Sequence, residues 1–263
     1  MMKSITCKGK HAELCRAIAD GRRDEAMQLI YAFFRSEENT DSYSVSLLTV
    51  IRELLEDGDS DEMYRMRVRM RSNGDRVLIN LAQFVWAFET GGLEDAAETL
   101  AGKCLSELPK LCRSMNDFAQ EEGMSAATEM AGRRIREAVR ILRMYFESVD
   151  NDDAVDTCDE VNLDMTRVFL FTHENMMSED LMIAAKCADR RGNSLIRDRL
   201  CREIMREYGS VIEKIQSSAE FNREWYETLE GVKYACEILD ESEPDHPYST
   251  QLKAIEQILR VGS

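Results

Sequence analysis

The sequence predicts an all-α protein: an irregular multi-helix bundle or a short helical stack of about nine to eleven helices. Three prolines and 13 glycines in 263 residues leave few points at which a helix must stop. The rest of the chain is rich in Ala, Leu, Glu, Arg and Met, which have high helix propensity. Apolar residues also recur at helical spacing over most of the chain. A chain of this length can bury a core without disulfides or metal.

The N-terminal part is expected to form a helical hairpin between His11 and Phe34, interrupted at Gly21. A polar connector, "SEENTDS", follows, and "SVSLLTVIRELLED" is expected to form the next helix. Further helices are predicted at about 93–105, 108–120, 125–148, 178–190, 194–216, 219–240 and 249–260.

Residues 64–81 fit two patterns. Arginines alternate with apolar residues in Arg65–Arg71, as in a strand, and Asn73-Gly74 is typical of a hairpin turn. A longer helical stripe, 77–88, follows Asp75, a residue type that often begins a helix. We therefore expect a helix–turn–helix here, with a single β-hairpin near 64–81 as the alternative.

The domain organisation is predicted to be one helical domain, 1–263. The stretch 148–160, "SVDNDDAVDTCDE", is acidic and lacks an apolar pattern, so it is the best candidate for a loop. Such a loop would allow a division into two lobes at that point.

Three glycines precede acidic helix starts and raise the question of a repeat. Gly21, Gly58 and Gly91 are 37 and 33 residues apart, close to the period of helical-hairpin repeats. The acids do not recur after Gly123, and a glycine before a charged first turn is common at any helix junction. An irregular stack of antiparallel helices is the favoured interpretation.

No catalytic signature stands out. The three histidines, His11, His173 and His246, have no recognisable nucleophile beside them. Cys7, His11 and Cys15 share one helical face, but over three turns they are too far apart for one metal ion. The prediction is therefore a protein that is not an enzyme, with no catalytic residues, metal or cofactor; an uncharacterised enzyme is the third hypothesis.

Clustered arginines are the sharpest feature of the sequence. In "GRRIREAVRILRMYF" they follow a helical spacing opposite an apolar face, which predicts a basic amphipathic helix. Arginine is well suited to pair with carboxylate or phosphate. The candidate binding residues are Arg133, Arg136, Arg140, Arg143, Arg65, Arg67, Arg69 and Arg197.

The charge balance bears on the partner. With 50 acids against 34 bases, the net charge of −16 disfavours nucleic acid and anionic membranes on average. The leading hypothesis is an adaptor that presents an arginine-lined or Met- and Cys-rich helical face to an acidic or phosphorylated segment of another protein. A helical RNA-binding protein that uses the same arginines on phosphates is the alternative. We further expect a cytoplasmic protein without a membrane partner, and possible homodimers.

Overall fold

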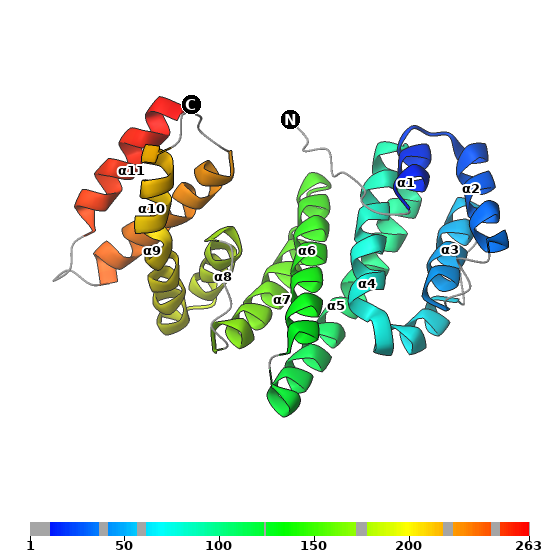
Figure 1. Cartoon of the computed structure of the whole chain (residues 1–263), viewed down its shortest axis with the longest axis horizontal. Coiled ribbons are helices and arrows are strands. Elements are labelled where there is room, and N and C mark those ends of the chain that lie inside the picture. The colour runs from blue at the N-terminus through cyan, green and yellow to red at the C-terminus, as the bar shows by residue number, and fades with distance from the viewer. Residues whose placement is uncertain are drawn as a thin grey trace. The chain divides into compact units, whose positions relative to one another are not determined.

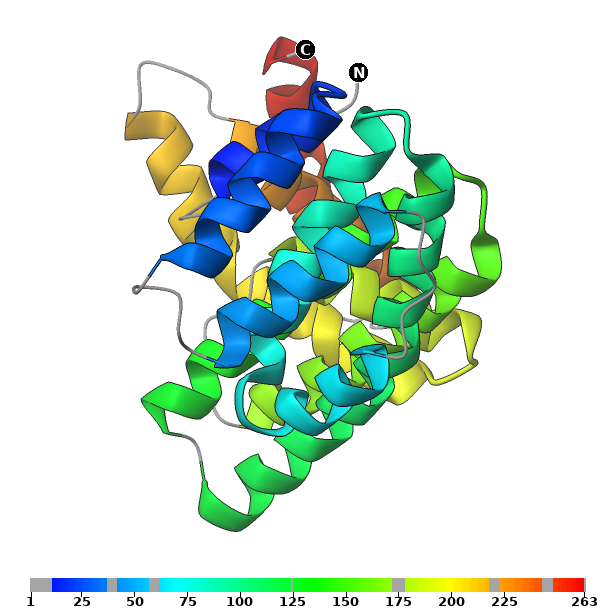
Figure 2. The ribbon, with the colours of Figure 1, turned by 90° about the vertical axis from the view of Figure 1, so that its right-hand side faces the viewer.

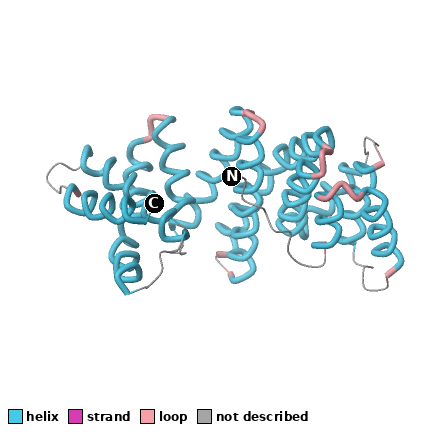
Figure 3. Tube along the Cα trace, turned by 90° about the horizontal axis from the view of Figure 1, so that it is seen from above, coloured by secondary structure: helices cyan, strands magenta, loops and turns pink. Residues whose placement is uncertain are grey.

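The computed structural model describes residues 11–36, 42–56, 62–123, 125–171, 178–217, 223–242 and 248–262. Over these residues it contains eleven α-helices and no strand, which confirms the predicted fold class (Figure 3). The helices, labelled in Figure 1, are α1 (Ala12–Ala19), α2 (Arg23–Arg35), α3 (Ser42–Leu55), α4 (Glu62–Thr90), α5 (Glu94–Glu122), α6 (Ala126–Ser148), α7 (Asp152–Phe171), α8 (Ser178–Arg190), α9 (Ser194–Ser217), α10 (Arg223–Ser242) and α11 (Ser249–Gly262). No helix in this part of the chain is both long and apolar enough to cross a membrane.

The chain forms two compact units, 1–158 and 159–263, and the boundary lies within α7. The predicted loop at 148–160 is wrong, because α7 begins at Asp152 after a short turn. The Asn151 side chain accepts a hydrogen bond from the Ala154 N–H at 3.1 Å, and acidic residues fill the first turn. Both features stabilise a helix N-terminus, so the acids that resemble a loop in the sequence begin a helix.

Helix α4 is the centre of the first unit. It packs against α1, α3, α5 and α6, while α2 lies between α1 and α3 (Figure 2). Its C-terminal half is buried on nearly every side, as expected for a helix surrounded by others. The Trp86 indole N–H donates to the Ile141 carbonyl of α6 at 3.1 Å, so the one polar atom of this ring is satisfied in the core.

Neither expectation for residues 64–81 is correct: the segment has no turn and no hairpin, and α4 runs through Asn73 and Gly74 without interruption. Gly74 is buried within the helix. Glycine costs a helix only about 1 kcal/mol, and the burial of the apolar residues that follow Gly74 on α4 exceeds that cost. Tertiary packing therefore overrides the local hairpin signal.

Helix α5 corrects a second expectation, because the helices predicted at 93–105 and 108–120 are one continuous helix. Pro109 lies inside it and removes one backbone hydrogen bond. The buried positions nevertheless continue at helical spacing on both sides of this proline, as Leu100, Cys104, Leu108 and Cys112. A single apolar stripe keeps both halves of α5 on the same core.

Four junctions between helices have the same turn, centred on Gly21, Gly92, Asp150 and Gly192. Each of these residues has a positive φ and donates its N–H to the carbonyl three residues earlier. The following N–H bonds to the carbonyl five residues before it, and the distances are 2.8–3.3 Å. This pattern is a Schellman C-cap. The turns are unevenly spaced along the chain, and Gly58, the remaining glycine of the suspected repeat, lies outside the described residues.

The second unit is built around α8, α9 and α10, which pack against one another, with α11 against α10. Its core includes Leu200, Ile204 and Leu239 together with buried, reduced cysteines of the same helices. The Sγ of Cys236 lies 3.5 Å from the Met205 Sδ, so the thiol packs among apolar groups. The described cysteines thus behave as small hydrophobic residues in both units.

The buried thiols make the fold sensitive to alkali. Burial, reinforced by a nearby carboxylate, raises the pKa of Cys104 to about 12, and burial raises the pKa of Cys201 and Cys236 to about 12 as well. Below pH 9, the ordinary value, each thiol is neutral in both states. Above pH 9 the thiol of the unfolded chain loses its proton while the buried thiol of the folded chain keeps it. The free energy of unfolding therefore falls as pH rises from about 9 to about 12.

We expect the urea midpoint of unfolding to drop clearly between pH 8 and pH 10.5 in the presence of a reductant. Cys104 alone contributes a slope of up to about 1.4 kcal/mol per pH unit. Cys104→Ala should be less stable at pH 8 because of its cavity, yet show a shallower loss with pH. An equal pH dependence in the variant and the parent would show that this thiol does not titrate as argued.

Candidate functional site

Helix α6 has the amphipathic character that its sequence predicts. Its N-terminus is capped by Ser125, whose hydroxyl accepts the Thr128 N–H at 3.2 Å. The expected apolar face, Ile135, Ala138, Val139, Leu142 and Phe146, is buried. Arg133, Arg140 and Arg143 of the predicted stripe lie outside this buried face.

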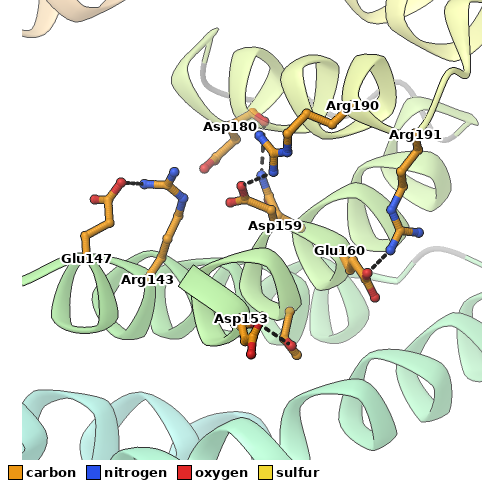
Figure 4. Close-up of polar contacts among 10 residues, drawn as sticks. Arg143, Glu147, Asp153, Asp159, Glu160, Asp180, Arg190 and Arg191 are labelled. Atoms are coloured by element: carbon orange, nitrogen blue, oxygen red, sulfur yellow. Dashed lines mark hydrogen bonds and ion pairs between the residues drawn. The ribbon is translucent and has the colours of Figure 1, made fainter. Parts of the chain in front are cut away.

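Three of these arginines pair with glutamates of their own helix. Arg133 pairs with Glu129, and the Arg140 Nη2 lies 2.9 Å from Glu137 Oε2. The Arg143 Nη1 lies 2.6 Å from Glu147 Oε1, in a pair drawn in Figure 4. These i, i+3 and i, i+4 pairs each contribute little stability, but they reduce the positive charge that α6 offers to a partner.

The remaining predicted residues are one arginine of α6, three arginines of α4 and one arginine of α9. Arg136 is buried, with 7% of its surface exposed, so the stripe is interrupted at its second member. Arg65, Arg67 and Arg69 lie on α4, at positions whose side chains are not described. Arg197 lies on α9, in the second unit.

Arg197 has a structural role within its own unit. Its guanidinium lies 2.7 Å from both the Asp189 and the Asp198 carboxylates. Hydrogen bonds to these two carboxylates raise its pKa further above the usual range for arginine. The side chain is only 19% exposed, so it joins α9 to the end of α8 more than it presents charge to solvent.

Two further arginines of the second unit join α8 to α7. The Arg190 Nη2 lies 2.7 Å from Asp159 Oδ2, and Arg191 pairs with Glu160 (Figure 4). Asp159 is almost fully buried, so Arg190 compensates a charge that would otherwise be costly there. The arginine-rich sequence around these residues is thus explained by the packing of two helices.

A pocket of about 620 Å³ lies in the first unit between α4, α5 and α6. This volume falls within the range of sites that bind small molecules or side-chain anchors. Small residues, including Gly74 and Ala131, leave the space open, and Met115 and Ile135 supply buried apolar lining. The full lining is Gly74, Asp75, Arg76, Leu111, Ser114, Met115, Phe118, Ala126, Ala127, Thr128, Met130, Ala131, Arg134 and Ile135.

Two large apolar side chains of this lining are exposed. Phe118 on α5 is 49% exposed and Met130 on α6 is 51% exposed. They belong to the same pocket although they come from different helices. Apolar side chains that converge at a pocket while open to water are typical of a site that another molecule covers.

The polar groups of the pocket carry a net positive charge. The Arg134 Nη1 lies 2.7 Å from Asp75 Oδ2, and these side chains are 28% and 17% exposed. The Arg134 Nη2 also donates to the Met130 Sδ at 2.8 Å. Arg76 is exposed, and its guanidinium makes no ion pair within the described part of the chain. The pocket lining therefore contains two guanidinium groups and one carboxylate.

Sequence reasoning did not find this pocket. The helical spacing selects Arg133 and not Arg134, because only the tertiary structure brings Arg134 opposite Asp75 of α4. Phe118 and Met130 appear in the sequence as ordinary members of two helices. The only usable signal was Arg76 at the end of the arginine-rich stretch that begins at Arg65.

Comparison with known proteins finds no matching protein family, no matching curated sequence and no matching solved structure.

Proposed function

We propose that the protein is a non-enzymatic interaction module that binds a segment of another protein in the pocket between α4, α5 and α6. The segment carries an apolar anchor beside an acidic or phosphorylated residue. The described cysteines are free, which fits the reducing environment of the cytoplasm, where we place this interaction.

The observation that carries the proposal is the combination of apolar exposure and pocket volume. Phe118 and Met130 offer an apolar surface at the opening, and Met115 lies deeper among small residues. Methionine side chains adapt to partners of different shape because they are flexible and polarisable. An apolar side chain that enters the pocket would release water from these surfaces, which favours binding.

The charge of the pocket supports the acidic part of the segment. Arg76 and Arg134 outnumber Asp75, whereas the whole chain carries a net charge of −16. A carboxylate or phosphate beside the apolar anchor would meet two guanidinium groups, with which it can form charge-assisted hydrogen bonds. Elsewhere on this acidic protein the same group would more often be repelled.

A protein partner is better supported than RNA. Binding to an RNA backbone needs several cations that can each neutralise a phosphate along a track. Three of the five arginines of α6 are instead paired with glutamates at 129, 137 and 147. The pocket also lacks a row of aromatic side chains on which bases could stack.

A peptide-display experiment tests the proposal. A library of random 12-residue peptides is selected on the purified full chain, and enriched peptides are measured by fluorescence anisotropy. We expect enriched sequences to combine an apolar residue with Asp or Glu. Phe118→Asp should weaken their binding at least about tenfold, since a charge would be placed in the apolar contact. Arg76→Glu should weaken it through repulsion.

Matched variants separate this pocket from other surfaces. Leu195→Asp changes an apolar residue of the second unit that is 84% exposed. Arg133→Glu changes an exposed arginine of α6, and neither residue lines the pocket. Both should leave peptide binding unchanged. The proposal fails if no peptide is enriched, or if enriched peptides bind all four variants equally. Tight, salt-dependent binding of a labelled 20-residue poly(U) RNA would instead favour the nucleic-acid alternative.

A further inference from the structure

We propose that Asp75 is an internal competitor that pairs with Arg134 at the pocket and holds the place of a carboxylate from the bound segment. This inference rests on the proposed function and names the recognition group of the same site. In the bound state, a Glu or Asp side chain of the partner protein would take up donors of Arg134 with help from Arg76.

The hydrogen bonds of Arg134 support this assignment. A guanidinium has five N–H donors in a planar arrangement suited to two oxygens at once. Within the described residues, Arg134 uses one nitrogen on Asp75 Oδ2 and the other terminal nitrogen on the Met130 sulfur. Thioether sulfur is a weak acceptor. A carboxylate oxygen that replaces this sulfur would form a stronger, charge-assisted bond.

The position of the pair also supports it. Asp75 and Arg134 belong to different helices, both line the pocket, and both remain partly exposed. An ion pair that only joined two helices would not need to line a pocket. A ligand that enters there reaches the guanidinium without first disrupting the core.

A carboxylate fits the site better than a phosphate. Asp75 already provides a carboxylate at 2.7 Å from the guanidinium, so this group suits the space. With one aspartate and two arginines in its lining, the pocket has a surplus of one positive charge. One carboxylate balances that surplus, whereas a doubly charged phosphate would exceed it and be repelled by Asp75.

If Asp75 competes with the ligand, removing its charge should strengthen the binding of an acidic ligand, although Asp75 itself lines the pocket. Asp75→Asn keeps the shape of the side chain, releases Arg134 from its ion pair and removes repulsion of the incoming carboxylate. We expect affinity for an acidic ligand to rise roughly five- to tenfold. A residue that served only to hold α4 and α6 together would have the opposite effect when replaced.

The experiment uses the full chain and three small probes: 4-phenylbutyrate, its neutral amide and phenyl phosphate, with binding followed by saturation-transfer NMR. The display-selected peptide, with its acidic residue present or replaced by Asn or Gln, provides a second readout. Asp117→Asn is the matched control, because it removes one negative charge from an exposed position on α5 that does not line the pocket. Circular dichroism confirms that each variant is folded at the temperature used.

We expect Asp75→Asn to strengthen binding of 4-phenylbutyrate but not of its amide, and Asp117→Asn to change neither. Arg76→Gln, which keeps the Asp75–Arg134 pair, should weaken the acidic probe. The inference is overturned if Asp75→Asn weakens acidic ligands or strengthens the amide equally, while the peptide still binds the pocket. A gain confined to phenyl phosphate would also overturn it. If neither peptide nor probe binds the parent chain, the proposed function itself fails.

Discussion

Replacing Gly91 with alanine is expected to lower the free energy of unfolding of the first unit by about 3 kcal/mol or more. A Cβ atom at this position would lie 2.1 Å from the Ile18 carbonyl oxygen and 3.0 Å from the Ile18 carbonyl carbon. Both are backbone atoms, so no side chain can rotate away. The end of α4 would have to move away from the end of α1, which would open part of the core.

Urea unfolding in a Trp225→Phe background measures this effect, because Trp86 is then the only tryptophan and lies in the core of the first unit. Gly102→Ala is the control. Apart from the adjacent backbone of its own helix, no atom lies within 4 Å of its added Cβ, and the residue is inside α5. This variant should gain about 0.5–1 kcal/mol from helix propensity. A Gly91→Ala protein as stable as the parent would show that α1 and α4 do not approach so closely.

The second large effect is expected at Phe84, where alanine should cost about 3–5 kcal/mol. The side chain is fully buried in α4, and its ring centroid lies 6.3 Å from that of His11, itself 4% exposed. Removing the ring leaves a cavity that the surrounding helices can fill only in part, because the backbone of α4 is held by α1, α3, α5 and α6.

Phe118→Ala is the matched comparison, since it removes the same ring from an exposed position on α5. It should change the free energy of unfolding by less than about 1 kcal/mol and should weaken the display-selected peptide. Denaturation and anisotropy on the same two variants separate the roles of the rings. Similar losses of stability would mean that Phe118 belongs to the core and is not a contact for a partner.

These two phenylalanines show why the fold was easier to predict than the site. The helical period, the scarcity of proline and the composition identify helices whatever their neighbours are, because those signals depend on local backbone geometry. The exposure of a given ring depends on which helices surround it. Nothing in the local sequence of Phe84 or Phe118 reports that.

The two misread segments have the same cause. Asn73-Gly74 and Pro109 are local signals to turn or stop, and each has a cost of only a few kcal/mol. The helices α4 and α5 continue through them. In α5 the apolar residues on both sides of Pro109 are buried in one core, and in α4 the apolar residues that follow Gly74 are buried. At 148–160 a loop was predicted where a helix begins. Acidic residues are common in solvent-exposed loops, but they also stabilise the first turn of a helix, as they do in α7.

The sequence by itself determined the all-helical class, the apolar face of α6 and the helix junction at Gly21, since each depends on residues adjacent in the chain. Only the tertiary structure decided the candidate site. It placed Arg134 against Asp75, buried Arg136, and gathered Phe118 and Met130 from separate helices. The physical reason is that a pocket is made by side chains distant in sequence, and their meeting depends on how whole helices pack.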